Sequence, residues 1–145
     1  MADESGSVQL VIFTLAGEQY AMPINSVQEI IRYRRPRSVA STEPWVQGVL
    51  SLRGHIVPVY DLADRLGTTS SLGEDSKIVI LEIAHQVAGV IVDTVDEVLT
   101  IDREHIESAP AADSAIIDSI AEIENRLVIL LNPGPILSSW EPIAA

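Results

Sequence analysis

Glu29 and Arg53 are the residues of this sequence whose chemistry most needs an explanation. Arg53 stands between two apolar runs, residues 49–52 and 56–60, of the types that form β-strands. A guanidinium buried between strands is costly unless a carboxylate pairs with it. Glu29, in an apolar segment upstream, is the candidate partner. We therefore expect a structural ion pair between Glu29 and Arg53, which would fix local geometry more than it adds stability.

The other polar residues offer no convergent set for catalysis. His55, His85 and His105 are scattered, and none has another histidine or a carboxylate at a spacing typical of metal sites. No serine lies in a nucleophile elbow, and no glycine-rich phosphate loop occurs. The acidic cluster at residues 93–97 alternates with valines, as on the solvent face of a strand. We expect no catalytic residue, no metal and no cofactor, which favours a binding module over an enzyme.

Charge is distributed unevenly along the chain, whose formal net charge is −12. This excess opposes binding to nucleic acid and to anionic lipid. Four of the nine basic residues nevertheless lie at residues 32–37, and ten of the 21 acidic residues lie at 93–124. Such a dipolar surface could steer charged partners, or these segments could be solvated loops. The arginine-rich segment could likewise contact an acidic partner or have no special role.

Length and composition favour one domain of 145 residues, without cysteines and without an apolar run long enough to span a membrane. The polar, acidic start does not resemble a secretion signal. We expect a cytoplasmic protein with no direct membrane insertion. Within it, residues 1–7 would be a flexible N-terminus, 8–137 the domain and 138–145 a C-terminal tail.

Short runs rich in valine and isoleucine predict about nine or ten strands and an all-β fold. Hairpins are expected where two such runs flank a short turn, at residues 8–15 with 20–24, 49–52 with 56–60, and 77–83 with 87–92. Single strands are expected at residues 29–33, 93–99 and 127–132.

The helical elements should be brief. We expect a helical turn at the Ser26 capping box, a turn at residues 44–47, a short helix from residue 61 with Gly67 just beyond its C-terminus, and a helix around 136–139. Residues 68–76 are typical of a polar loop and 110–113 of a linker.

Residues 115–124 are ambiguous. Ile116, Ile117, Ile120 and Ile123 fit one face of a helix. Residues 124–126 followed by an apolar run resemble a hairpin turn instead. The periodicity alone favours the helix.

Several segments together resemble the CheW family of chemotaxis coupling proteins. The main one runs from Gly48 to Leu62, and the others are residues 13–24, 27–31, 89–99 and 127–132, all in the family's order. The resemblance covers roughly residues 8–137. It implies two small five-stranded SH3-like β-barrel lobes packed together, with few short helices, and it favours strands at residues 115–124.

The resemblance also implies a function. CheW-like proteins are non-catalytic adaptors that couple the cytoplasmic tip of methyl-accepting chemoreceptors to the regulatory domain of a CheA-like histidine kinase. The pathway could be flagellar, pilus-linked or another chemosensory system, and a small ligand-binding β-barrel or enzyme is the more distant alternative. By resemblance, the receptor-binding groove would lie between the two lobes and include Val27, Glu29, Leu52, Arg53, Gly89 and Val98. Gly48 would lie on the side that binds the kinase.

Overall fold

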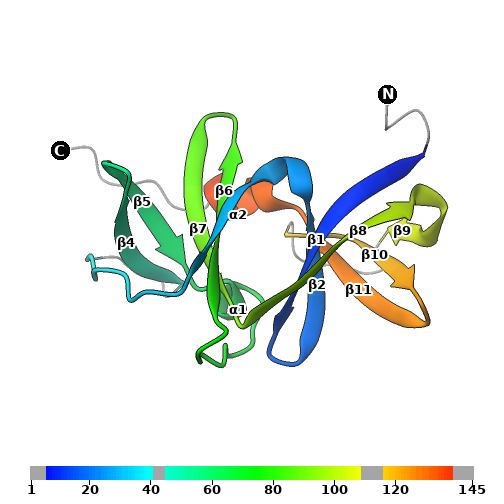
Figure 1. Ribbon diagram of the computed structural model, residues 1–145, viewed down its shortest axis with the longest axis horizontal. Coiled ribbons are helices and arrows are strands. Elements are labelled where there is room, and N and C mark those ends of the chain that lie inside the picture. Colours follow the sequence, from blue (N-terminus) through cyan, green and yellow to red (C-terminus); the bar gives the residue numbers. More distant parts are fainter. Residues whose placement is uncertain (1–5, 41–44, 109–115, 139–145) are drawn as a thin grey trace.

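The computed structural model describes residues 6–40, 45–108 and 116–138, which form two lobes of β-sheet side by side (Figure 1). The terminal lobe is a six-stranded sheet in the order β8 (Thr94–Asp102), β1 (Ser7–Leu15), β2 (Glu18–Pro23), β11 (Arg126–Leu131), β10 (Ile117–Ile123) and β9 (Ile106–Ser108). The central lobe is a five-stranded sheet in the order β3 (Val27–Arg32), β6 (Lys77–Ile83), β7 (Gln86–Val92), β5 (His55–Tyr60) and β4 (Val46–Leu52). The chain thus enters the central lobe after β2 and leaves it after β7.

The hairpins close through two-residue turns in which both residues have positive φ. This backbone matches the right-handed twist of the flanking strands. The turns are Ala16–Gly17 (52° and 82°), Arg53–Gly54 (50° and 81°), Ala84–His85 (51° and 69°) and Glu124–Asn125 (50° and 67°). Glycine takes the second position in only two of the four turns, so every turn places at least one other residue in this backbone conformation, which is strained for residues other than glycine.

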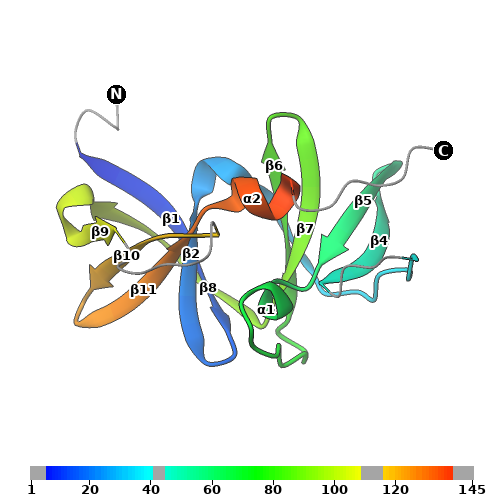
Figure 2. The same ribbon diagram turned by 180° about the vertical axis from the view of Figure 1, so that it is seen from behind.

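An apolar core joins the two lobes. Phe13, Met22 and Leu131 from the terminal lobe pack in one cluster with Val79 and Val90 from the central lobe, and all five are buried. Helix α2 (Pro133–Ser138) follows β11 and packs against β6 and β7 of the other lobe (Figure 2). The lobes are therefore held together by continuous burial of apolar surface.

Asp93 adds a polar link where the chain crosses between the lobes. Its Oδ2 accepts a hydrogen bond from the Ala16 amide of the terminal lobe at 2.9 Å. Its Oδ1 accepts one from the Ser71 amide of the central lobe at 2.8 Å. One carboxylate therefore ties a hairpin turn of one lobe to a loop of the other.

The all-β, two-lobed architecture expected from the resemblance is confirmed, although one sheet has six strands rather than five. The extra strand is the three-residue β9, too short to give a sequence pattern. Strands replace the helix that periodicity favoured at residues 115–124, because β10 pairs with both β9 and β11. The short helix α1 (Leu62–Arg65) and the helix α2 lie where brief helices were expected.

One predicted turn is displaced, and another is shorter than expected. A 3-10 turn occupies Ile24–Ser26, so the helical turn ends at Ser26 instead of beginning there, and Ser26 starts no helix. At residues 44–47, Pro44 lies outside the described residues, Trp45 lies in a turn, and Val46 and Gln47 already belong to β4. The predicted linker at 110–113 also lies outside the described residues.

Candidate partner-binding site

Glu29 and Arg53 meet on the central lobe. Glu29 lies on β3, and Arg53 occupies the turn between β4 and β5. Arg53 Nη2 donates a hydrogen bond to Glu29 Oε1 at 2.8 Å, and Arg53 Nη1 donates to Glu29 Oε2. This two-pronged geometry fixes the orientation of both groups.

The pair is not buried between strands, contrary to the prediction from sequence. The turn carries Arg53 out of the sheet, so 69% of its side chain is exposed, against 22% for Glu29. The hydrogen bond from Arg53 lowers the pKa of Glu29, and the bond to Glu29 raises the pKa of Arg53. Both groups therefore remain ionised around neutral pH, and the contact positions them at the surface.

A hollow of about 610 Å³ opens beside this pair. Its lining residues, which define the hairpin hollow, are Gln28, Glu29, Leu52, Arg53, His55, Ile56, Val57, His85 and Val87. Ile56 presents 69% of its surface to solvent, the largest exposure among the exposed large apolar residues described. An apolar floor beside fixed charges suits recognition of an amphipathic segment of another protein.

Only some of the residues expected in a receptor groove line this hollow. Glu29, Leu52 and Arg53 do so. Val27 lines a separate hollow of about 430 Å³, which shares Gln28 and His85 with the first.

The other two expected groove residues lie elsewhere. Gly89 is buried in β7, where an added Cβ would lie 2.7 Å from Ile78 Cγ2. Val98 is 48% exposed on β8, in the terminal lobe. The six residues therefore do not line one groove.

Gly48, expected on the kinase side, has a clear structural task. Its φ is +148°, and an added Cβ would lie 2.6 Å from the carbonyl carbon of Arg37. The Arg37 segment is this close because its amide and carbonyl bond to the carbonyl and amide of Val49, both at 2.9 Å. Glycine at this position lets the segment after β3 pair with β4.

Six residues of the hairpin hollow were not anticipated from sequence: Gln28, His55, Ile56, Val57, His85 and Val87. The two-residue turn at Ala84–His85 was recognisable between two strand-like runs. What the sequence does not reveal is that this turn and the Arg53 turn lie at the same end of the sheet, because β5 and β7 pair in parallel.

The acidic cluster at residues 93–97 includes a carboxylate, that of Asp96, that links neighbouring strands by hydrogen bonds. Asp96 accepts hydrogen bonds from Thr14 (2.6 Å), Gln19 (2.9 Å) and Thr94 (2.8 Å). Burial opposes ionisation of Asp96, but these bonds outweigh it and lower its pKa. The carboxylate is thus held ionised as a cross-strand link, which leaves it poorly suited to acid–base catalysis.

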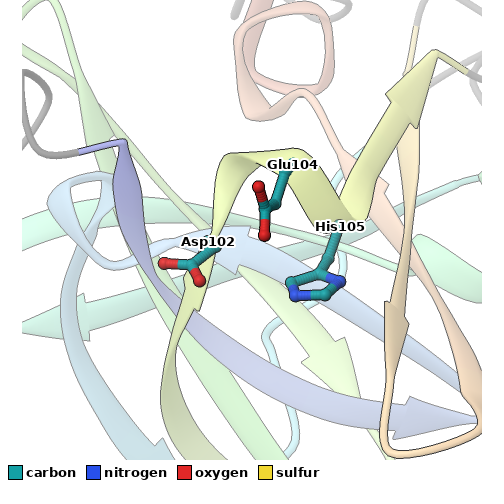
Figure 3. Close-up of side chains that lie close together, drawn as sticks. All are labelled: Asp102, Glu104 and His105. Carbon is teal, nitrogen blue, oxygen red and sulfur yellow. The ribbon is translucent and has the colours of Figure 1, made fainter.

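His105 does lie near carboxylates, although its sequence spacing did not suggest it. The 3-10 turn Arg103–His105 brings Asp102, Glu104 and His105 together, with their ligand atoms within 4.8 Å of one another (Figure 3). All three side chains are exposed. An exposed group of this kind is common without a metal, so it supports no metal centre.

Comparison with known proteins decides the family. Residues 9–141 match the family model described as a CheW-like domain. The chain belongs to the CheW family. It is 32% identical to a chemotaxis protein CheW of Klebsiella aerogenes over 97% of this chain and 88% of that protein. It is 31% identical to a chemotaxis protein CheW of Bacillus subtilis over 89% of this chain and 86% of that protein.

Two further matches bear on fold and pathway. The crystal structure of the scaffolding protein TtCheW from Thermoanaerobacter tengcongensis superposes with a TM-score of 0.81 at 36% identity, covering 86% of this chain and 88% of that one. Protein PilI of Pseudomonas aeruginosa is 32% identical, but over only 57% of this chain and 47% of that protein. Among the described residues, no helix is long and apolar enough to cross a membrane.

Proposed function

We propose that this CheW-family chain is a non-catalytic adaptor that couples chemoreceptors to a CheA-like histidine kinase. The observation that carries the proposal is the CheW-like match across residues 9–141, which spans both lobes. The adaptor would work in the cytoplasm, recruited to receptor arrays at the inner face of the membrane.

A pilus-linked pathway is the second candidate, since PilI is among the relatives. Its match spans about half of each chain, whereas the CheW relatives match over nearly the whole length. The flagellar-type chemotaxis role is therefore the preferred function.

The hairpin hollow is the proposed site for the receptor tip. Ile56 and Leu52 would contact apolar residues of a receptor helix, while Arg53, held in place by Glu29, would bind a polar group beside them. Micromolar affinity, about −8 kcal/mol, is sufficient when many such contacts act together in an array.

The remaining expected residues take other places in this proposal. Val27 would extend the contact through its neighbouring hollow. Gly89 would contribute through the packing of the central lobe, where it is buried, and Val98 would belong to a second surface on the terminal lobe. The kinase regulatory domain would bind near Gly48, on the β4 side of the central lobe.

Affinity purification from a lysate of the source cells tests this assignment. Tagged wild-type protein should recover both a CheA-like kinase and a chemoreceptor, identified by mass spectrometry. Arg53→Ala should lose most of the receptor while keeping the kinase, and Arg53→Lys should lose less because it keeps the charge.

Arg126→Ala is the matched control. Arg126 also pairs with a carboxylate, donating to Glu97 at 2.6 Å, but it lies in the terminal lobe. It should recover both partners as wild type does. If the wild type recovers neither the kinase nor the receptor, the proposed adaptor function is wrong. If the wild type and both Arg53 variants recover the receptor equally, only the proposed receptor site is wrong.

A further inference from the structure

The hairpin formed by β4 and β5 carries most of the wall of the hairpin hollow, and it lies at one end of the molecule (Figure 1). β4 is an edge strand of the five-stranded sheet, and β3 is the edge strand on the other side. Within the described part of the chain, one isolated backbone bridge, between Arg37 and Val49, connects β4 to the segment after β3. The rest of the outer edge of β4 therefore depends on side chains for its hydrogen bonds.

Backbone groups of alternate β4 residues point to this outer edge. Leu52 pairs with His55 across a two-residue turn, and such a pair exchanges hydrogen bonds inside the hairpin. Hydrogen-bonded and non-hydrogen-bonded pairs alternate along two antiparallel strands, so the amides and carbonyls of Ser51 and Val49 point away from β5. The residue opposite Val49 agrees with this direction, because Pro58 has no amide to donate.

These outward positions are each bound from the β3 side, and the kind of contact changes toward the hairpin tip. At Val49 the contact is backbone to backbone, since its amide and carbonyl both bond to Arg37 at 2.9 Å. At Ser51 a side chain takes over, because Arg34 Nη2 donates to the Ser51 carbonyl at 3.2 Å. At the next position, in the turn, two side chains meet in the ion pair described above. The gap between the two edges thus widens toward the tip, and longer groups span it.

Arg34 supplies the middle contact from outside the hairpin hollow. Its guanidinium bonds to a carbonyl that the amide of a neighbouring strand would bond in a complete sheet. The side chain is exposed and is not among the residues that line the hollow. Ser51 is followed directly by Leu52 and Arg53, which do line it. A contact at Ser51 therefore acts on the wall of the hollow without occupying the space where a partner would bind.

Two neighbouring arginines provide a comparison for Arg34. Arg32 and Arg35 are also exposed, and among the described residues neither side chain makes a hydrogen bond or an ion pair. All three arginines carry the same charge on one short segment. An effect of charge alone should therefore be shared by the three, whereas an effect on the hairpin should belong to Arg34.

We propose that Arg34 is a positioning residue for receptor binding, which holds the outer edge of β4 and thereby fixes Leu52 and Arg53 in the wall of the hairpin hollow. This inference rests on the proposed receptor function of that hollow. A binding surface that is fixed before its partner arrives loses less conformational entropy on binding. Loss of Arg34 should therefore weaken receptor binding by making the hairpin tip more mobile.

Hydrogen exchange of the purified chain, followed by mass spectrometry, tests the positioning step by itself. In Arg34→Ala the amides of the hairpin tip, residues 50–57, should exchange about three to ten times faster than in wild type, as expected for the loss of one hydrogen bond. Arg34→Lys should be intermediate, because lysine can still donate to the carbonyl. Arg32→Ala and Arg35→Ala remove the same charge and should exchange at the tip as wild type does.

Receptor affinity tests the consequence of that step. The probe is the purified cytoplasmic fragment of the chemoreceptor that wild-type protein recovers from the lysate. Arg34→Ala should bind it about three- to tenfold more weakly, whereas Arg32→Ala and Arg35→Ala should bind it as wild type does. In an Arg53→Ala background the loss from Arg34→Ala should be smaller, because residues that act through one hairpin do not contribute additively.

Equal exchange at the hairpin tip in Arg34→Ala and wild type would overturn the proposal. Receptor affinity that falls equally in the three alanine variants would also overturn it, because charge rather than position would then be responsible. If wild-type protein binds no receptor while Arg34→Ala still loosens the hairpin, the proposed function is wrong and Arg34 has only a structural role.

Discussion

Replacing Gly48 with alanine should destabilise the protein more than the same change at Gly54 or Gly73. The new Cβ would lie 2.6 Å from the Arg37 carbonyl carbon, and Arg37 is held by two backbone hydrogen bonds to Val49. Relieving this close contact therefore requires a shift of the Arg37 backbone rather than rotation of a side chain.

Two costs add in this substitution. Alanine at a φ of +148° costs about 1–3 kcal/mol in backbone strain. Displacing the Arg37 segment costs about 1–3 kcal/mol more, as in an overpacked core. The sum, about 2–6 kcal/mol, is a large part of the 5–15 kcal/mol that is typical of a small domain.

Two matched glycines separate these costs. Gly54 has a φ of +81° with nothing within 4 Å of an added Cβ, so Gly54→Ala should cost only the strain, about 1–2 kcal/mol. Gly73 has the same open space without a positive φ, so Gly73→Ala should stay within about 0.5 kcal/mol of wild type.

Urea denaturation followed by circular dichroism gives the three free energies of unfolding on one scale. A loss for Gly48→Ala no larger than that for Gly54→Ala would refute the argument from close approach. A stable, folded Gly48→Ala that still fails to recover the kinase would instead place Gly48 in the kinase contact.

Two other perturbations follow from the same structure. Burial raises the pKa of Tyr60 to about 12, so the unfolded chain loses this proton first, and stability should fall between about pH 10 and pH 12 by about 2–3 kcal/mol. Tyr60→Phe should lose less over that range in urea titrations, and an identical loss would assign the effect to other groups. Ile56→Ser should leave the unfolding free energy within about 0.5 kcal/mol of wild type, because the side chain is 69% exposed, yet reduce receptor recovery. Leu127→Ser, similarly exposed on the terminal lobe, is its control, and equal receptor recovery by the two variants would argue against the hairpin hollow.

Local pattern was enough to predict most hairpins, because two strand-like runs and a two-residue turn are contiguous in sequence. It failed where the pattern itself was mixed. In β10, Ser119, Ala121 and Ile123 are buried at a spacing of two, which is the period of a strand. Ile116 and Ile120 add a spacing of four, and since isoleucines are the most apolar residues of the segment, their spacing imitates a helix face.

The candidate site was harder to predict, because its parts come together only through long-range topology. Val98 follows Gly89 by nine residues, yet the crossing at Asp93 puts them in different lobes. Conversely, Glu29 on β3 meets Arg53 at the turn of the β4–β5 hairpin, although the sheet order separates β3 from β5 by two strands. Sequence indicated that these two charges need each other, but the predicted reason, burial of Arg53, was wrong.

The exposed position of the pair suggests what it does. Arg53 has a positive φ, a strained conformation for a residue other than glycine, and within the described part of the chain its side chain donates hydrogen bonds to Glu29 alone. These two bonds attach the hairpin tip to β3, while the Arg37–Val49 bridge attaches β4 to the segment after β3. The hairpin that bears Leu52 and Ile56 is therefore fixed from the β3 side by both contacts. Loss of Arg53 would free the wall of the hairpin hollow as well as remove a charge, which is why Arg53→Lys, able to keep one bond to Glu29, should retain part of the receptor binding that Arg53→Ala loses.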